Sequence, residues 1–307
     1  MKESIQRIID QLNSVVMGGH DASYLLLVGL MARGHILIQD EPGLGKTTLV
    51  KALANSLAGT FKRIQFTPDL LPADILGYNI YDQSTQKFKF IDGPIFANFI
   101  LADEINRASP RTQSAMLETM NESQVTIDGE TRHLSKLFNV IATQNDLYST
   151  GTFPLPEPQL DRFMLSFRIG IPSHAIQNNI LLSHANSKPS LSVNAVLSEE
   201  EIISMQEDVD KVFVKDNVAN YIIDLSEATR SSNKLVNGVS IRASISLMKA
   251  AQACAYIDER DSVYPDDIKK LIKPVFSHRL KVKRMATVKK NLVDDILDDI
   301  LNKIKVP

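Results

Sequence analysis

The segment HILIQDEPGLGKTTL, residues 35–49, is the most informative part of this 307-residue chain. HILIQ reads as a short buried strand, and a helix is expected from Lys46 to about Leu57. Between them, Gly43 and Gly45 let the backbone approach a bound group closely. The N–H groups of such a loop, together with the positive end of the following helix, form an anion site. The segment therefore predicts a strand–loop–helix unit that cradles phosphate.

The loop predicts ATP and Mg²⁺ as cofactors. Lys46 is expected to reach the β- and γ-phosphates, and the Thr47 hydroxyl is expected to bind Mg²⁺. The other residues expected to contact the nucleotide are Glu41, Pro42, Gly43, Leu44, Gly45 and Thr48. One position departs from the G-x-x-x-x-G-K-[ST] pattern, because Asp40 stands where that pattern has its first glycine.

A pair of acidic residues ends another apolar strand, FANFILADE (96–104). Asp103 at that strand end is expected to hold Mg²⁺, and Glu104 to polarise the attacking water as a general base. Adjacent acids at a strand end are also common on protein surfaces. The phosphate loop in the same domain favours the catalytic interpretation.

Short apolar strands alternate with helices in the first half of the chain. Strands are expected at 62–66, 98–103, 137–143 and 164–169, and helices at 22–33 and 110–121. This alternation indicates an α/β fold with a parallel sheet covered on both faces. The segments 78–92 and 124–134 alternate around turns and predict inserted β-hairpins, the second with Asp128-Gly129 at its turn.

After Pro172 the strand signals stop, and helices are expected. Ser198 and Glu201 form a capping box for a helix over 199–210, and the later helices are expected at 215–230, 240–256 and from 265 onward. We therefore expect an α/β nucleotide-binding core over 1–172 and an all-α lid over 173–307. The acidic, apolar tail KNLVDDILDDILNKI is interpreted as a last helix that packs on the lid or, alternatively, binds a partner.

Composition excludes several classes of protein. Hydrophobic residues make up 44% and charged residues 23% of the chain, as in globular proteins, and the net charge is −2. Cys254 is the single cysteine, which excludes an intramolecular disulfide and a cysteine-based zinc site. No secretory signal is evident, and the apolar run at 24–32 is about half of a membrane span. We expect a cytoplasmic protein without a transmembrane segment.

Four further motifs together identify a family resemblance. They are DEINRASPRTQSAMLE (103–118), ATQN (142–145), PLPEPQLDRF (154–163) and NGVSIRASISLMKAA (237–251). With the phosphate loop, their order and spacing resemble the MoxR family of AAA+ ATPases over roughly residues 10–285. The resemblance implies an AAA+ core with strand order 5-1-4-3-2, followed by the helical lid.

The resemblance also implies roles for three residues outside the loop. Asn145 matches the sensor 1 position that orients the attacking water. Arg162 matches the arginine finger that reaches a neighbouring subunit's nucleotide, and Arg242 matches the lid arginine of sensor 2. The alternative for Asn145 is an ordinary turn residue after a strand. For Arg162 it is a salt bridge with Asp161 or a neighbouring acid, and for Arg242 it is an ordinary position on a helix surface.

The expected assembly is a homo-oligomeric ring, with a hexamer as the implied size. By resemblance, its partner is a client protein that it matures or activates, in some relatives a von Willebrand A-domain protein. The competing hypothesis is a DNA-remodelling motor, in which Lys87, Lys89, Arg132 and His133 on the hairpins would touch phosphates. The net acidic core argues against nucleic acid as a partner. A third alternative is a nucleotide-switched scaffold that binds ATP but hydrolyses it poorly. Arg107 and Arg111 are interpreted either as arginines at a subunit interface or as ordinary solvated charges.

Overall fold

A computed structural model describes residues 1–16, 19–40, 43–144, 151–186, 193–283 and 292–307. At its centre lies a five-stranded sheet in the order β2-β5-β8-β1-β9, with every pairing parallel. The strands are β1 (Ile36–Gln39), β2 (Phe61–Gln65), β5 (Phe99–Asp103), β8 (Asn139–Gln144) and β9 (Leu165–Phe167). Numbered along the chain, they lie in the order 5-1-4-3-2, so the predicted AAA+ sheet is confirmed.

A hydrophobic cluster lies on each face of this sheet, as the apolar strands predict. In β1, Ile36 and Ile38 belong to one hydrophobic cluster and Leu37 to the other, because successive side chains point to opposite faces. The helices α1 (Glu3–Val15), α2 (His20–Met31) and α3 (Lys46–Ser56) contribute to the first cluster. The helices α4 (Pro72–Leu76) and α5 (Pro110–Glu122) contribute to the second.

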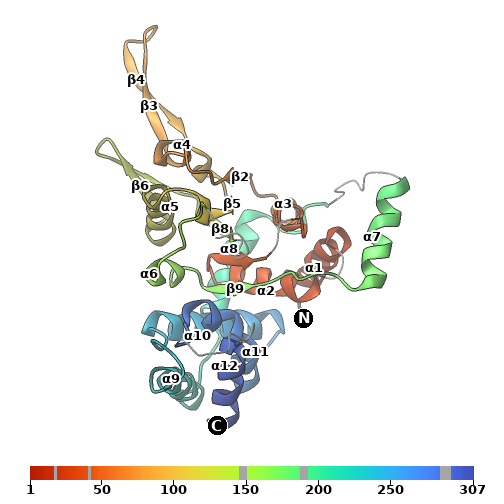
Figure 1. The fold of residues 1–307 in the computed structure, drawn as a ribbon. Helices are drawn as coiled ribbons and strands as arrows, with labels where there is room; N and C mark the ends of the chain where they lie inside the picture. Colours follow the sequence, from red (N-terminus) through yellow and green to blue (C-terminus); the bar gives the residue numbers. More distant parts are fainter. Residues whose placement is uncertain (17–18, 41–42, 145–150, 187–192, 284–291) are drawn as a thin grey trace.

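Two β-hairpins extend from the second face, as Figure 1 shows. The first consists of β3 (Gly77–Asp82) and β4 (Lys87–Asp92), and the second of β6 (Gln124–Ile127) and β7 (Glu130–His133). Asp128 and Gly129 have φ values of 52° and 83°, so the predicted two-residue turn is present. The hairpins are joined where Asn79 Nδ2 donates to Asp128 Oδ2 at 2.7 Å.

The second half is helical. Its helices are α7 (His174–Asn186), α8 (Glu199–Val209), α9 (Asp216–Arg230), α10 (Ile241–Ile257), α11 (Pro265–Phe276) and α12 (Leu292–Lys303). Ser198 and Glu201 form the expected capping box of α8. The apolar residues of α8–α12 continue the cluster that covers the first face of the sheet. Within the described ranges, no helix is long and apolar enough to cross a membrane.

The C-terminal helix α12 packs on the chain's own helices. It buries Ile296, Leu297 and Ile300, while Lys234 and Lys273 pair with its outward acids at 2.8 and 2.7 Å. Its apolar side and two of its acidic residues therefore have partners inside the molecule. This arrangement matches the first of the two interpretations of the tail.

Short irregular elements connect these parts. They are the 3₁₀ turns η1 (Pro94–Phe96), η2 (Ile105–Arg107) and η3 (Ser277–Arg279), and the one-turn helix α6 (Glu157–Leu160). Strand β9 ends at Phe167, two residues earlier than expected. The backbone N–H groups of Ile169 and Gly170 donate to the Asp40 carboxylate instead of continuing a ladder.

His35, at the start of β1, is a buried polar link between three elements. Its Nε2 lies 2.8 Å from the Met120 carbonyl at the end of α5. Its Nδ1 accepts the Val140 N–H of β8 at 3.0 Å. A protonated imidazole has no acceptor for that N–H, and burial lowers the pKa of His35 to about 4.

The buried neutral His35 predicts a loss of stability in mild acid. Unfolded histidine binds its proton below pH 6.5, whereas folded His35 does so only near pH 4. The free energy of unfolding should thus fall by roughly 2 kcal/mol between pH 7.5 and 5 on account of this residue. Urea unfolding at the two pH values measures the change. His35→Gln should be less stable at pH 7.5 yet lose less on acidification, and equal losses would refute the assignment.

Candidate active site

A cavity of about 510 Å³ lies where β2 and β5 end beside the start of α3. The residues that line it come from the phosphate loop, α3 and these two strand ends. They are Gly43, Gly45, Lys46, Thr47, Thr48, Arg63, Gln65, Asp103 and Glu104. The structure thus brings together most of the residues predicted to hold nucleotide and metal, including both members of the acidic pair.

The loop geometry depends on its two glycines. Gly43 and Gly45 have φ values of 86° and 80°, a region that L side chains rarely adopt. A Cβ on Gly43 would meet no atom within 4 Å, so the backbone conformation rather than lack of space requires glycine there. Gly45 is followed directly by α3, whose first residues are Lys46 and Thr47. The positive end of that helix therefore faces the cavity.

Lys46 is a buried cation that lines the cavity. Its side chain is largely buried, and its Nζ donates to the Asp40 carbonyl at 2.6 Å. A buried ammonium at a helix N-terminus concentrates positive charge where phosphate would bind. Glu41 and Pro42, which were also predicted to contact the nucleotide, lie outside the described residues.

The contacts of Asp40 explain why aspartate stands where the phosphate-loop pattern has glycine. Its Oδ2 accepts the N–H groups of Ile169 and Gly170 at 2.6 and 2.9 Å. Its own N–H donates to the Gln144 carbonyl at 3.3 Å. A glycine at position 40 has no carboxylate to accept the first two bonds. Asp40 therefore ties the start of the phosphate loop to the chain that leaves β9.

Asp103 is held from two sides. Its Oδ2 accepts from Arg63 Nη2 at 2.6 Å and Nε at 3.1 Å, and its Oδ1 accepts from Thr143 Oγ1 at 2.6 Å. Carboxylate oxygens can each accept more than one contact. Thr47 and Asp103 border the same cavity and supply the oxygen ligands that Mg²⁺ prefers. The oxygen atoms that Thr47 and Asp103 offer beside the cavity therefore fit a magnesium ion.

Glu104 has an unusual backbone conformation, with φ 56° and ψ 50°. Non-glycine residues held in this left-handed region carry local strain and are frequent at functional sites. Its backbone N–H donates to Thr143 Oγ1 at 2.8 Å. Its Oε2 accepts from Gln65 Nε2 and from Arg107 Nη1, both at 3.1 Å. The carboxylate is thus directed and restrained at the cavity edge.

The sequence interpretation missed Arg63, Gln65 and Thr143. A signal for them exists in the predicted sheet, because Gln65 is paired with Asp103 in the register of β2 and β5. Arg63 precedes Gln65 by two residues and so lies on the same face. Thr143 follows Ala142, which is paired with Ala102. Strand order combined with register would have identified all three.

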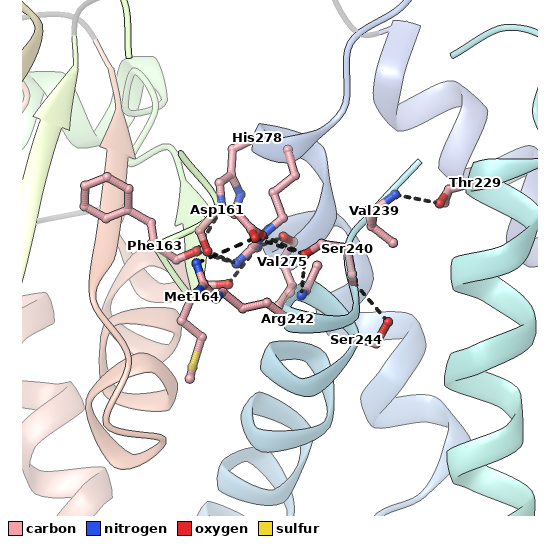
Figure 2. A network of polar contacts seen from close by, with 12 residues as sticks. Asp161, Phe163, Met164, Thr229, Val239, Ser240, Arg242, Ser244, Val275 and His278 are labelled. Carbon is pink, nitrogen blue, oxygen red and sulfur yellow. Dashed lines mark hydrogen bonds and ion pairs between the residues drawn. The ribbon is translucent and has the colours of Figure 1, made fainter. Parts of the chain in front are cut away.

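The two predicted catalytic arginines lie outside the set of residues that lines the cavity. Arg162 Nη1 donates to the Leu117 carbonyl of α5 at 2.5 Å. Arg242, on the first turn of α10, is more than half exposed and lies 3.9 Å from Asp161. Figure 2 shows Arg242 near Asp161. Asn145, the predicted sensor 1 residue, lies outside the described residues.

The remaining predicted arginines differ in their surroundings. Arg107 pairs with Glu104, whereas Arg111 is exposed at the start of α5. On the hairpins, Lys87, Lys89 and His133 are exposed. Arg132 stacks on the Phe90 ring, with its Cζ 4.0 Å from the ring centroid, and pairs with Glu130. Arg132 is therefore already engaged within the hairpins, which does not favour the DNA-motor alternative.

Comparisons with known proteins agree with this geometry. Residues 35–165 match the family model "ATPase family associated with various cellular activities (AAA)", and residues 227–300 match the AAA lid domain. The chain is 36% identical to Chaperone MoxR1 of Mycobacterium tuberculosis, over 99% of this chain and 82% of that protein. It is 44% identical to the uncharacterized protein YeaC of Bacillus subtilis, over 98% of this chain and 94% of the relative.

A solved structure extends the likeness to the fold. The crystal structure of a proposed ATPase from Cytophaga hutchinsonii superposes with a TM-score of 0.91 and 36% identity, over 99% of this chain and 95% of that one. Sequence, sheet order, lid and phosphate loop all agree with the predicted family. The chain belongs to the MoxR family of AAA+ ATPases.

Proposed function

We propose that this chain hydrolyses ATP with Mg²⁺ in the cavity beside α3 and uses the energy to remodel a partner protein. One observation carries the proposal: Lys46, Thr47, Asp103 and Glu104 border a single cavity. Each of these groups has a distinct task in phosphoryl transfer to water. The name of the mycobacterial relative, Chaperone MoxR1, supports a protein as the partner.

The chemistry proposed is in-line attack of water on the γ-phosphate. The Lys46 ammonium and the backbone N–H groups of the loop hold the phosphates and offset the negative charge of the transition state. Glu104 accepts the proton of the attacking water, and Gln65 and Arg107 orient its carboxylate. Thr47 and Asp103 would hold Mg²⁺, which supplies charge neutralisation at the phosphate oxygens when bound.

The proposed active form is a ring, with a hexamer as the size implied by the family resemblance. Asn145 orients water at the site, Arg242 senses the γ-phosphate from the lid, and Arg162 contributes to the neighbouring subunit's site. The proposed division places the core at 1–172 and the lid at 173–307. Motion of the lid against the core would then move the two hairpins, which act on the client protein. Proteins with a von Willebrand A domain are one proposed class of client.

Lys46→Ala is expected to abolish tight ATP binding, because the buried ammonium at the start of α3 is removed. Isothermal titration calorimetry with Mg·ATP measures the affinity. Lys51→Ala is the matched control, since Lys51 is exposed on the same helix. Unchanged affinity in the Lys46 variant would show that the phosphate loop is misassigned.

Glu104→Gln should retain ATP binding and lose at least about 10²-fold in turnover, because the amide cannot accept the proton of water. Steady-state phosphate release measures turnover, and calorimetry measures binding. Glu118→Gln, on α5, serves as the control for removal of one acidic charge. A near-normal kcat in Glu104→Gln would place the general base elsewhere.

Arg162→Ala should bind ATP nearly as the unmodified chain does but turn it over slowly, because Arg162 is proposed to act on the neighbour's nucleotide. Mixed with Lys46→Ala chains, which offer Arg162 but hold no ATP, it should regain activity. The ATPase rate against mixing ratio should bow upward. A straight line between the low rates of the two unmixed variants would refute the proposal that Arg162 acts in trans.

A further inference from the structure

Arg279 is a buried cation at the contact between the lid and the sheet. It lies in η3, and its side chain is 3% exposed. Its Nε donates to Asp161 Oδ1 at 2.8 Å, and its Nη2 donates to the Phe163 carbonyl at 2.6 Å. Its Nη1 donates to the Met164 carbonyl at 3.1 Å and to the carbonyl of Val275. Three of these four acceptor residues belong to the loop that enters β9. The lid thus holds this loop mainly by its backbone.

The residue before it reinforces the contact. His278 Nε2 lies 3.1 Å from the same Phe163 carbonyl, and burial lowers the pKa of His278 so that the ring is neutral. A neutral ring with its proton on Nε2 donates this bond. The backbone of Phe163 therefore receives donors from two successive lid side chains.

Asp161 connects the loop to a second lid element. The carboxylate that pairs with Arg279 also accepts from Ser240 Oγ, at 3.0 and 3.2 Å to its two oxygens. Ser240 is the N-cap of α10, and Arg242 follows two residues later, 3.9 Å from Asp161. Figure 2 shows Asp161, Ser240, Arg242 and His278 converging from these separate elements.

Arg162 lies between the residues that the lid holds. Asp161 is fixed on one side of it and Phe163 on the other, while its own Nη1 reaches the Leu117 carbonyl. The guanidinium of Arg279 is buried, and removing its acceptors would leave an unpaired charge inside the protein, which is strongly unfavourable. Any displacement of η3 is therefore expected to carry the Arg162 loop with it.

We propose that Arg279 is a positioning residue for the arginine finger: it fixes the Arg162 loop to the lid, so that the lid position in one subunit sets the placement of Arg162 in the next subunit's site. This inference rests on the proposed function of Arg162 in trans. The lid carries Arg242, so the nucleotide of one subunit would influence hydrolysis in its neighbour through Asp161 and Arg279. Arg279 itself touches no substrate in this scheme.

A mixing experiment separates this role from a structural one. Arg162→Ala chains bind ATP and accept a finger from their neighbours. The finger comes either from Lys46→Ala chains or from chains that carry both Lys46→Ala and Arg279→Lys. The lysine keeps the charge but cannot donate to three loop acceptors in the same geometry. The double variant should restore at least about 10-fold less ATPase activity, as a misplacement near 1 Å costs up to about 10²-fold.

The acceptor keeps Arg279, so the KM for ATP should stay unchanged and only kcat should fall. Lys46→Ala with Lys281→Gln is the matched donor control. Lys281 also joins the lid to the core, through Glu157 at 3.0 Å, but its pair does not involve the 161–164 loop. This donor should restore activity as fully as Lys46→Ala alone.

A third donor, Lys46→Ala with Asp161→Asn, covers the case in which the Arg279 variant misfolds, since asparagine matches aspartate in size but has no negative charge to pair with Arg279. Circular dichroism identifies the folded donors, and sedimentation with a slowly hydrolysed ATP analogue confirms that they assemble with the acceptor. Reduced restoration by the folded Arg279 or Asp161 donor supports the proposal. Full restoration by either folded donor overturns it and leaves the trans role of Arg162 intact. Failure of Lys46→Ala itself to restore activity refutes that trans role instead.

Discussion

The parallel alignment of all five central strands is the constraint on which the site depends. It brings the carboxyl ends of β1, β2, β5 and β8 to one edge of the sheet. The phosphate loop leaves β1 at this edge, and Asp103 ends β5 there. Thr143 of β8 shows how this alignment brings side chains of neighbouring strands together. Its hydroxyl donates to Asp103 and accepts the backbone N–H of Glu104, so neighbouring strands orient both acids.

Two aspartates connect the edge strand β9 to other parts of the chain. Asp40 joins the phosphate loop to the segment after β9. Asp161 joins the segment before β9 to η3 and to the N-terminus of α10. Strand β9 is only three residues long, and carboxylates fix the chain on both sides of it. The edge strand therefore lies between the phosphate loop and the lid, and it is tied to each by charge-assisted hydrogen bonds.

Much of the fold follows from local sequence patterns. Short apolar strands between helices predict a doubly covered parallel sheet, and Asp128-Gly129 predicts its hairpin because both positions need positive φ. The strand order came from the family resemblance and agrees with the structure. Helix α7 had no specific prediction, since its apolar residues do not gather on one face, and Leu181 and Leu182 are both exposed. The early end of β9 was also missed, because its cause is the distant carboxylate of Asp40.

The phosphate loop, the acidic pair and the helical second half could be predicted from sequence alone, because each depends on residues adjacent in the chain. The three-dimensional fold places Arg63, Gln65 and Thr143 around that acidic pair, since strand register sets which side chains meet. The fold also pairs Asp161 with Arg279, 118 residues away, rather than with the adjacent Arg162. Nothing local distinguishes those two arginines. The distinction arises because packing buries Arg279 against the loop that enters β9, where the Asp161 carboxylate and two backbone carbonyls accept its N–H groups.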